Sequence, residues 1–296
     1  MSHRPIPVRA HLKSPARIGR SPVVDVEAFI HSAIQSKYPK HAFLGEETYS
    51  KGSSKEYLIQ NGPTWVVDPL DGTVNFTHAF PMFCVSIALV LNNRPIIGVI
   101  FAPLLNQLFS ACRGKGAWLN ETTRLPLLGK AISPMPANAP GKCIFACEWG
   151  KDRRDIADGN LHRKVDSFMN MAAEVGGRDG KGGMVHGVRS LGSATMDLAY
   201  TAMGSFDIWW EGGCWEWDVA AGICLLEEAG GLITTANPPD DYQTAKIEPA
   251  KLGGRLYLAI RPAGDGPTEK GRQSQERVVR EVWHRVRKLD YSRPGV

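Results

Sequence analysis

The chain has 296 residues, of which 43% are hydrophobic and 22% are charged, proportions typical of globular proteins. They exclude a disordered, collagen-like or coiled-coil chain. The longest apolar run, Phe83 to Leu91, is strand-sized and far short of the roughly 18 residues that a membrane helix needs. The formal net charge is +5, and its distribution requires neither a nucleic-acid nor a membrane partner.

The cysteines and the basic termini bear on the protein's location. The six cysteines stand in apolar context without a metal-ligand spacing, which is typical of buried thiols in a reducing compartment and predicts a cytoplasmic protein. Residues 1–21 are basic, contain no acidic residue and include three prolines that interrupt any helix. We interpret them as a disordered tail, with a targeting peptide as the alternative, ahead of a single domain over 22–296.

The first half of this domain begins with a helix and continues with strands. Asp25 can cap the helix and Pro39 ends it, and the Pro69–Thr73 segment is a turn after the first long strand. The expected elements, in chain order, are a helix over 25–37, a short apolar run over 41–45, a polar loop over 49–62, and strands over 64–68, 83–91, 96–102, 107–111 and 117–120.

A proline-rich stretch over 122–141 separates two αβ halves. The second half is expected to contain strands over 142–148, 184–189, 206–211, 232–235 and 256–260, helices over 161–173, 192–203 (opened by Ser193), 219–229 and near the C-terminus, and a glycine-rich loop over 176–183. Groups of strands alternate with groups of helices. This favours an α/β (α+β) protein with layered sheets and helices between and outside them.

Acidic residues stand at the ends of several expected elements. Glu46 ends the short apolar run, Asp68 and Asp71 flank the turn, and Asp218 precedes an apolar helix. Hard divalent cations such as Mg²⁺ take carboxylate and carbonyl oxygens, and the turn can direct Asp68, Asp71 and the Leu70 carbonyl at one point. Taken singly, these residues are equally explained by turns and helix caps.

Gly72 and Thr73, directly after Asp71, favour the metal interpretation. They present small side chains and free N–H groups where a phosphate could approach closely, and the Thr73 hydroxyl could orient a water molecule. A metal beside a phosphate predicts metal-assisted phosphoryl transfer to water.

Three motifs resemble those of the inositol monophosphatase family, in the same order and at similar separations. They are Trp65-Val-Val-Asp-Pro-Leu-Asp-Gly-Thr-Val-Asn-Phe76, Trp217-Asp-Val-Ala-Ala-Gly222 and Phe43-Leu-Gly-Glu-Glu47. The resemblance covers residue 25 to the C-terminus. The 143–193 stretch and the Tyr291-Ser-Arg-Pro ending are most similar to the member from fungal quinate-utilisation clusters. The family implies an α-β-α-β-α layered sandwich, dependence on Mg²⁺, inhibition by lithium and a homodimer.

The resemblance also implies a role for each matching residue. Glu46, Asp68 and the Leu70 carbonyl would hold the first of two or three Mg²⁺ ions, and Asp68, Asp71 and Asp218 the second. Glu46 and Thr73 would activate the attacking water, with Asp71 also in the catalytic set. The substrate-binding residues would be Asp71, Gly72, Thr73, Gly192, Ser193, Ala194, Glu211 and Asp218, with Gly72 and Thr73 amides on the phosphate and the 192–194 segment and Glu211 on the alcohol.

The predicted activity is hydrolysis of inositol monophosphate or a similar small phosphorylated polyol. The alternatives are a 3'(2'),5'-bisphosphate nucleotidase with the same metal motif and a non-catalytic regulatory member of the family. The Asn75-Phe76-x-His78 pattern favours the inositol branch.

Two basic stretches bear on stability and on substrate binding. Residues 1–20 stand where the family has a further helix and an acid-bearing segment, so we expect reduced stability and activity. The run Lys151–Arg154 could steer an anionic substrate, but a solvated surface run is the favoured interpretation.

Overall fold

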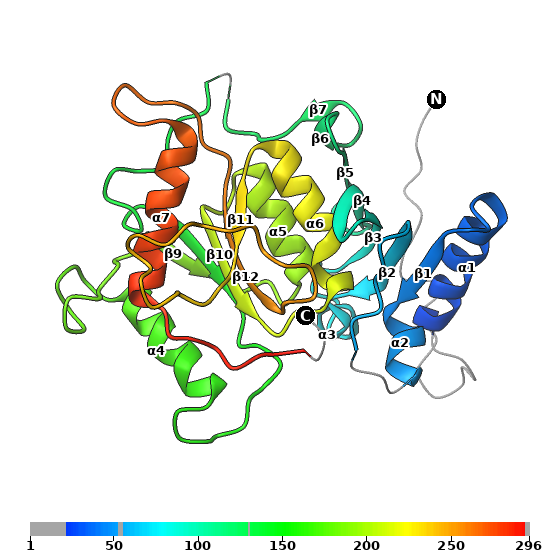
Figure 1. The fold of residues 1–296 in the computed structure, drawn as a ribbon, viewed down its shortest axis with the longest axis horizontal. Helices are drawn as coiled ribbons and strands as arrows, with labels where there is room; N and C mark the ends of the chain where they lie inside the picture. Colours follow the sequence, from blue (N-terminus) through cyan, green and yellow to red (C-terminus); the bar gives the residue numbers. More distant parts are fainter. Residues whose placement is uncertain (1–21, 53–55, 130, 294–296) are drawn as a thin grey trace.

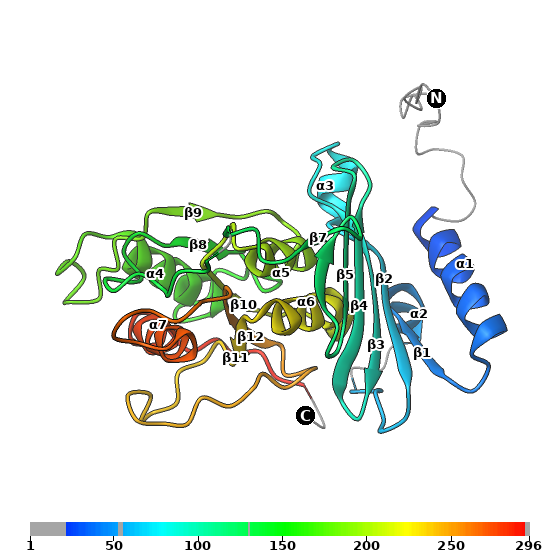
Figure 2. The ribbon, with the colours of Figure 1, turned by 90° about the horizontal axis from the view of Figure 1, so that it is seen from above.

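The computed structural model describes residues 22–52, 56–129 and 131–293. The predicted basic tail, residues 1–21, lies outside the described residues. Figure 1 shows the ribbon, and Figure 2 shows it turned by 90°, the view in which its layers are clearest.

Helices and sheets alternate in five layers (Figure 2). Helices α1 (Pro22–Lys37) and α2 (Glu46–Gly52) lie on the outer face of the first sheet. Helices α5 (Ala194–Met203) and α6 (Glu216–Ala229) fill the space between the sheets. Helices α4 (Asn160–Ala172) and α7 (Gly271–Arg285) lie beyond the second sheet. The predicted α-β-α-β-α sandwich is therefore confirmed.

The first sheet has seven strands that follow one another in chain order, with only the first pair parallel. Its strands are β1 (Ala42–Gly45), β2 (Thr64–Asp71), β3 (Cys84–Leu91), β4 (Arg94–Ala102), β5 (Gln107–Cys112), β6 (Gly116–Leu119) and β7 (Thr123–Arg124). A short helix, α3 (Thr73–Thr77), follows β2 directly.

The second sheet has five strands in the spatial order β11-β12-β10-β8-β9. The pairs β10–β8 and β8–β9 are parallel, and the others are antiparallel. The strands are β8 (Ile144–Cys147), β9 (Gly187–Arg189), β10 (Ile208–Gly212), β11 (Leu232–Thr234) and β12 (Leu256–Ile260).

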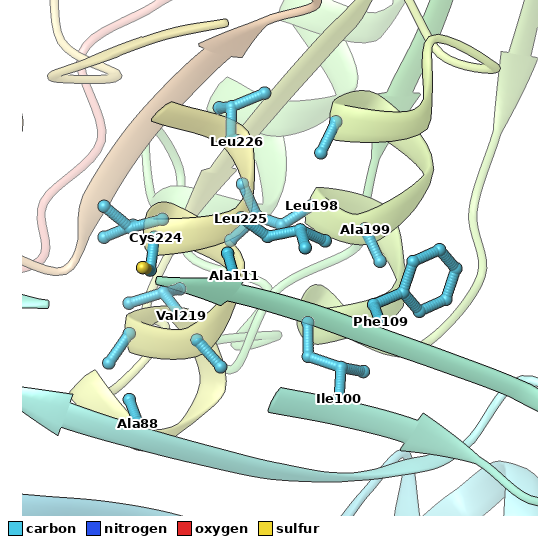
Figure 3. Close-up of a cluster of buried hydrophobic side chains, with 14 of the residues drawn as sticks. Ala88, Ile100, Phe109, Ala111, Leu198, Ala199, Val219, Cys224, Leu225 and Leu226 are labelled. Atoms are coloured by element: carbon cyan, nitrogen blue, oxygen red, sulfur yellow. The ribbon is translucent and has the colours of Figure 1, made fainter. Parts of the chain in front are cut away.

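The main core lies between the first sheet and the α5–α6 pair (Figure 3). Ile100 and Phe109 of the sheet are fully buried against Leu198 of α5 and Leu225 of α6. Because α6 is covered on nearly all sides, its sequence is apolar around the whole helix rather than along one stripe. A second cluster of buried residues packs the other face of the second sheet against α7, including Trp210, Val278 and Trp283.

The structure corrects three local expectations. The predicted loop over 49–62 begins as part of α2, and β2 continues through the predicted turn as far as Asp71, with a register shift between Asp68 and Asp71. Asp218 lies inside the first turn of α6 rather than before the helix. The start of α2 and the end of β2 are held by distant residues, Glu27 and the start of α5, whereas α6 begins with a local capping box in which Asp218 accepts from the Trp215 amide.

The sheets are joined between β7 and β8, within the predicted boundary over 122–141. The division of 22–296 into two halves of one domain stays a prediction. In the part of the chain that the structure describes, no helix combines the length and apolar character needed to cross a bilayer.

Candidate active site

A cavity of about 420 Å³ lies where both halves of the chain meet. Its wall includes the end of β2, the start of α3, the start of α5, the first turn of α6 and the segments that follow β8 and β10. All the predicted site residues line it: Glu46, Asp68, Leu70, Asp71, Gly72, Thr73, Gly192, Ser193, Ala194, Glu211 and Asp218.

Asp68 and Asp71 occupy the irregular end of β2. Asp68 accepts a hydrogen bond from the Leu70 amide at 2.8 Å, and Leu70 lines the cavity beside it. Asp71 accepts hydrogen bonds from the Ser193 hydroxyl and from the Thr195 amide, the latter at 3.0 Å. The start of α5 therefore fixes the Asp71 carboxylate.

Asp218 is the third residue of α6 and accepts a hydrogen bond from the Trp215 amide at 2.8 Å. The Thr195 side chain donates to the Asp218 carbonyl at 2.8 Å. Because Thr195 also binds Asp71 through its amide, one residue of α5 ties together the acids of β2 and α6.

Each of these three aspartates offers one carboxylate oxygen to a common group whose atoms lie within 4.8 Å of one another. Burial raises the pKa of Asp68 and Asp71, and it raises the pKa of Asp218 to about 7. For Asp68, the neighbouring negative charges add to the increase. Like charges held together out of water favour a bound cation, and the donors are the hard oxygens that Mg²⁺ prefers. The three aspartates therefore fit the predicted Mg²⁺ site.

Glu46 stands beside this group at the start of α2. Burial raises its pKa, and hydrogen bonding with Asp68 partly offsets the rise. Its position depends on Glu27 of α1, whose buried carboxylate accepts hydrogen bonds from the amides of Glu47, at 2.8 Å, and Thr48, at 2.9 Å. Glu27 lies outside the predicted site.

Gly72 and Thr73 form the start of α3. Gly72 has a φ of +84°, and a Cβ there would lie 2.7 Å from the Met82 carbonyl, so glycine is required on both counts. The Thr73 hydroxyl donates to the Leu70 carbonyl at 3.1 Å. Both residues line the cavity beside the three aspartates, as the sequence predicted.

Ser193 caps α5 by accepting a hydrogen bond from the Met196 amide at 3.2 Å, which confirms the predicted helix start. Gly192, just before it, has a φ of +70°. Asn75 of α3 holds this loop by donating to the Leu191 carbonyl at 2.7 Å. The segment predicted to contact the alcohol is thus tied to the segment predicted to contact the phosphate.

Glu211, predicted to bind the alcohol, is buried at the end of β10. It forms an ion pair with Lys164, and both side chains are 3% exposed. Its carboxylate also accepts hydrogen bonds from the amides of Glu148 and Gly212, each at 2.9 Å. Glu211 therefore lines the cavity with its charge already balanced.

Three further charged residues of the cavity wall lie outside the predicted site. Glu148 follows β8 and accepts hydrogen bonds from the Ser190 hydroxyl at 2.6 Å and from the Gly192 amide at 2.8 Å. Its place after a buried strand, like that of Glu46, is the signal that could have found it. Lys151 and Arg153 also line the cavity, although the sequence favoured a solvated surface run.

Comparison with known proteins gives close relatives over most of the chain. Protein qutG of Emericella nidulans is 73% identical over 271 residues, which cover 91% of this chain and 82% of that protein. Quinic acid degradation cluster protein x of Neurospora crassa is 70% identical over 274 residues, 92% of this chain and 80% of that protein. Inositol monophosphatase 2 of Saccharomyces cerevisiae is 40% identical over 271 residues, with coverage of 90% and 82%.

A solved structure and a family model agree with these relatives. The inositol monophosphatase from Anabaena (Nostoc) superposes with a TM-score of 0.64 at 29% identity, covering 89% of this chain and 85% of that one. The family model described as "Inositol monophosphatase family" matches residues 23–287. This chain therefore belongs to the inositol monophosphatase family, with a resemblance to the members of quinate clusters.

Proposed function

We propose that this protein is a Mg²⁺-dependent phosphatase that hydrolyses inositol monophosphate or a similar small polyol phosphate. The observation that carries the proposal is the group of three aspartate oxygens within 4.8 Å of one another. It lies beside the amides of Gly72 and Thr73 in a cavity large enough for a small phosphomonoester. Membership of a phosphatase family supports the same reaction class.

The metal-binding roles are those that the family resemblance implies, and all the residues concerned line the cavity. Glu46, Asp68 and the Leu70 carbonyl would hold one Mg²⁺, and Asp68, Asp71 and Asp218 would hold a second. The proposal includes a third Mg²⁺ ion. When bound, the ions would supply positive charge to the phosphate oxygens and lower the pKa of a coordinated water.

The chain's own residues would orient the reactants. Glu46 would accept a proton from the attacking water, and the Thr73 hydroxyl would hold that water by hydrogen bonding. The Gly72 and Thr73 amides would bind the phosphate, and the 192–194 segment would border the alcohol. Since Glu211 is engaged by Lys164 and two amides, its proposed contact with the alcohol must use an oxygen lone pair that these donors leave open.

The names of the relatives suggest the physiological setting. One of the fungal relatives is a quinic acid degradation cluster protein, and the chain is 70% identical to it. We therefore propose quinate metabolism as the setting of the reaction.

The direct test is phosphate release from inositol 1-phosphate with and without Mg²⁺, for the wild type, for Asp71→Asn and for Asp240→Asn. Asp240 is a matched control because its side chain is 96% exposed and lies outside the cavity. Turnover that requires Mg²⁺, disappears in Asp71→Asn and persists in Asp240→Asn is the expected result.

Other outcomes select the alternatives. Turnover only of an adenosine 3',5'-bisphosphate would favour the nucleotidase. Folded protein that releases no phosphate from any phosphomonoester in Mg²⁺ would overturn the proposal in favour of a non-catalytic family member.

A further inference from the structure

We propose that Lys151 and Arg153 recognise a second anionic group on the alcohol part of the substrate. The inference rests on the proposed function and adds a preference within its substrate class, for phosphomonoesters whose alcohol carries a carboxylate or a further phosphate. Both side chains line the same cavity as the aspartates, and both are exposed to its solvent.

The conformation of the segment after β8 separates its four charged residues into two sets. Asp152 and Arg154 pair with each other, the Arg154 Nε lying 2.8 Å from an Asp152 carboxylate oxygen. Asp152 also accepts a hydrogen bond from Asn160 at 3.3 Å. Lys151 and Arg153 alternate with this pair and line the cavity, whereas Asp152 and Arg154 do not.

Neither cavity-facing cation is held in an ion pair by the part of the chain that the structure describes. Among the described residues, the side chains of Lys151 and Arg153 form no ion pair and no hydrogen bond. The Lys151 stem packs against Gly213, where an added Cβ would lie 3.3 Å from its Cγ.

The two other acidic residues of the cavity wall, Glu148 and Glu211, already have protein partners. The Glu211 carboxylate is paired with Lys164, and the Glu148 carboxylate accepts from Ser190 and Gly192. Lys151 senses the negative charge of Asp218 first and also that of Asp71 and Glu46, all residues proposed to hold metal. Once divalent cations neutralise these carboxylates, the positive charge of Lys151 becomes available to a ligand.

The chemistry of the pair suits an oxyanion rather than a neutral hydroxyl. An arginine guanidinium binds a carboxylate or phosphate through two parallel hydrogen bonds, and a nearby ammonium adds charge. A phosphate at the aspartate group and a second anion at Lys151 and Arg153 would hold the substrate at two points. An alcohol with hydroxyl groups alone would leave the positive charges of Lys151 and Arg153 without a negative partner.

Matched substrates test the inference with the full chain in Mg²⁺. Gluconate 6-phosphate and glucitol 6-phosphate have the same carbon chain and the same phosphate, and differ in a carboxylate against a hydroxymethyl group. Adenosine 3',5'-bisphosphate and adenosine 3'-phosphate provide the corresponding pair for a second phosphate. The ratio of kcat/KM within each pair isolates the second anion and distinguishes its two sources.

The wild type is expected to prefer the member with the second anion in at least one pair by about tenfold or more, the size of a charge-assisted contact. Arg153→Gln and Lys151→Gln should each reduce that ratio severalfold. Arg154→Gln, a neighbouring arginine directed away from the cavity, should leave the ratio unchanged.

A wild type that hydrolyses both members of each pair equally well would overturn the inference and leave the proposed function intact. An equal decrease for both members in Arg153→Gln would also overturn it, because the side chain would then act on the shared phosphate. No turnover of any phosphomonoester would instead overturn the proposed function, and the inference with it.

Discussion

The buried carboxylate of Glu27 in α1 accepts a hydrogen bond from the backbone amide of Glu47 in α2, 2.8 Å away. A second carboxylate oxygen binds the Thr48 amide at 2.9 Å. Glu27 thus caps α2 from another element and holds Glu46 at the edge of the acidic group. Gly45 permits this approach, because a Cβ there would lie 2.4 Å from the Glu27 carboxyl carbon.

Glu27→Gln is expected to weaken the response to Mg²⁺. The glutamine loses the negative charge and one acceptor oxygen, which loosens the start of α2, and losses of about 10-fold to 100-fold in metal affinity are typical for residues that orient ligands. A Mg²⁺ titration of activity and of the melting temperature measures the change. Asp25→Asn, an exposed acid on the same helix, is the control. Identical titrations for Glu27→Gln and Asp25→Asn would disprove the positioning role.

The stability of the metal-free protein is expected to fall as the pH rises from 6 to 8. Burial raises the pKa of Asp218 from 3.8 to about 7, so the folded state binds more protons than the unfolded state between these values. The free energy of unfolding therefore decreases as the pH rises toward the folded-state pKa of Asp218, and it levels off above that pKa. This one group contributes roughly 1.4 kcal/mol between pH 6 and 8, or about 3 °C in melting temperature.

Thermal melts in a chelator provide the measurement. Asp218→Asn should have a shallower pH dependence than the wild type, and Mg²⁺ should stabilise the wild type more at pH 8 than at pH 6, because protons compete with the ion. A wild-type melting temperature that rises with pH in the chelator would contradict the prediction.

Lys164→Met is expected to destabilise the protein by roughly 3–5 kcal/mol, since it leaves the Glu211 carboxylate unpaired in the interior. Both side chains are 3% exposed, so water cannot replace the lost partner. The double variant Lys164→Met/Glu211→Gln should recover part of the loss, because no isolated charge remains. Denaturant unfolding of the wild type, both single variants and the double variant gives the coupling. Strict additivity would show that the pair does not interact.

Gly98→Ala is expected to cost about 1–3 kcal/mol through overpacking. A Cβ at Gly98 of β4 would lie 2.4 Å from the Ala221 carbonyl, which belongs to the backbone of α6 and cannot rotate away. Gly62→Ala is the matched control, because nothing lies within 4 Å of the added atom. Equal melting temperatures for the two variants would exclude a close contact between β4 and α6.

Much of the fold could be predicted from the sequence because its elements carry local signals. The β-branched and apolar run of β3 and the serine that caps α5 needed no knowledge of their surroundings. The elements that were missed depend on distant residues. The start of α2 is capped by Glu27, and the end of β2 is held through Asp71 by the start of α5.

The candidate site, like the fold, has features that could be predicted from the sequence and features that could not. The family resemblance predicted a set of site residues, and all of them line the cavity, while their individual roles stay predictions. The pairing of Glu211 with Lys164 was not foreseeable, because the two residues belong to different elements and no local pattern links them. The alternation that separates Lys151 and Arg153 from Asp152 and Arg154 depends on the backbone conformation after β8.

The aspartate group has a consequence for the order of folding. Asp68 and Asp71 come from the first sheet, whereas Asp218 comes from α6, much later in the chain. Contacts between such distant segments form late, after a large loop has closed. We therefore expect the ion site to be completed after the folding barrier, so that Mg²⁺ slows unfolding while the refolding rate stays nearly constant. Bound ions would then stabilise the native state kinetically, because unfolding would first have to separate the ligands of the first sheet from Asp218 of α6.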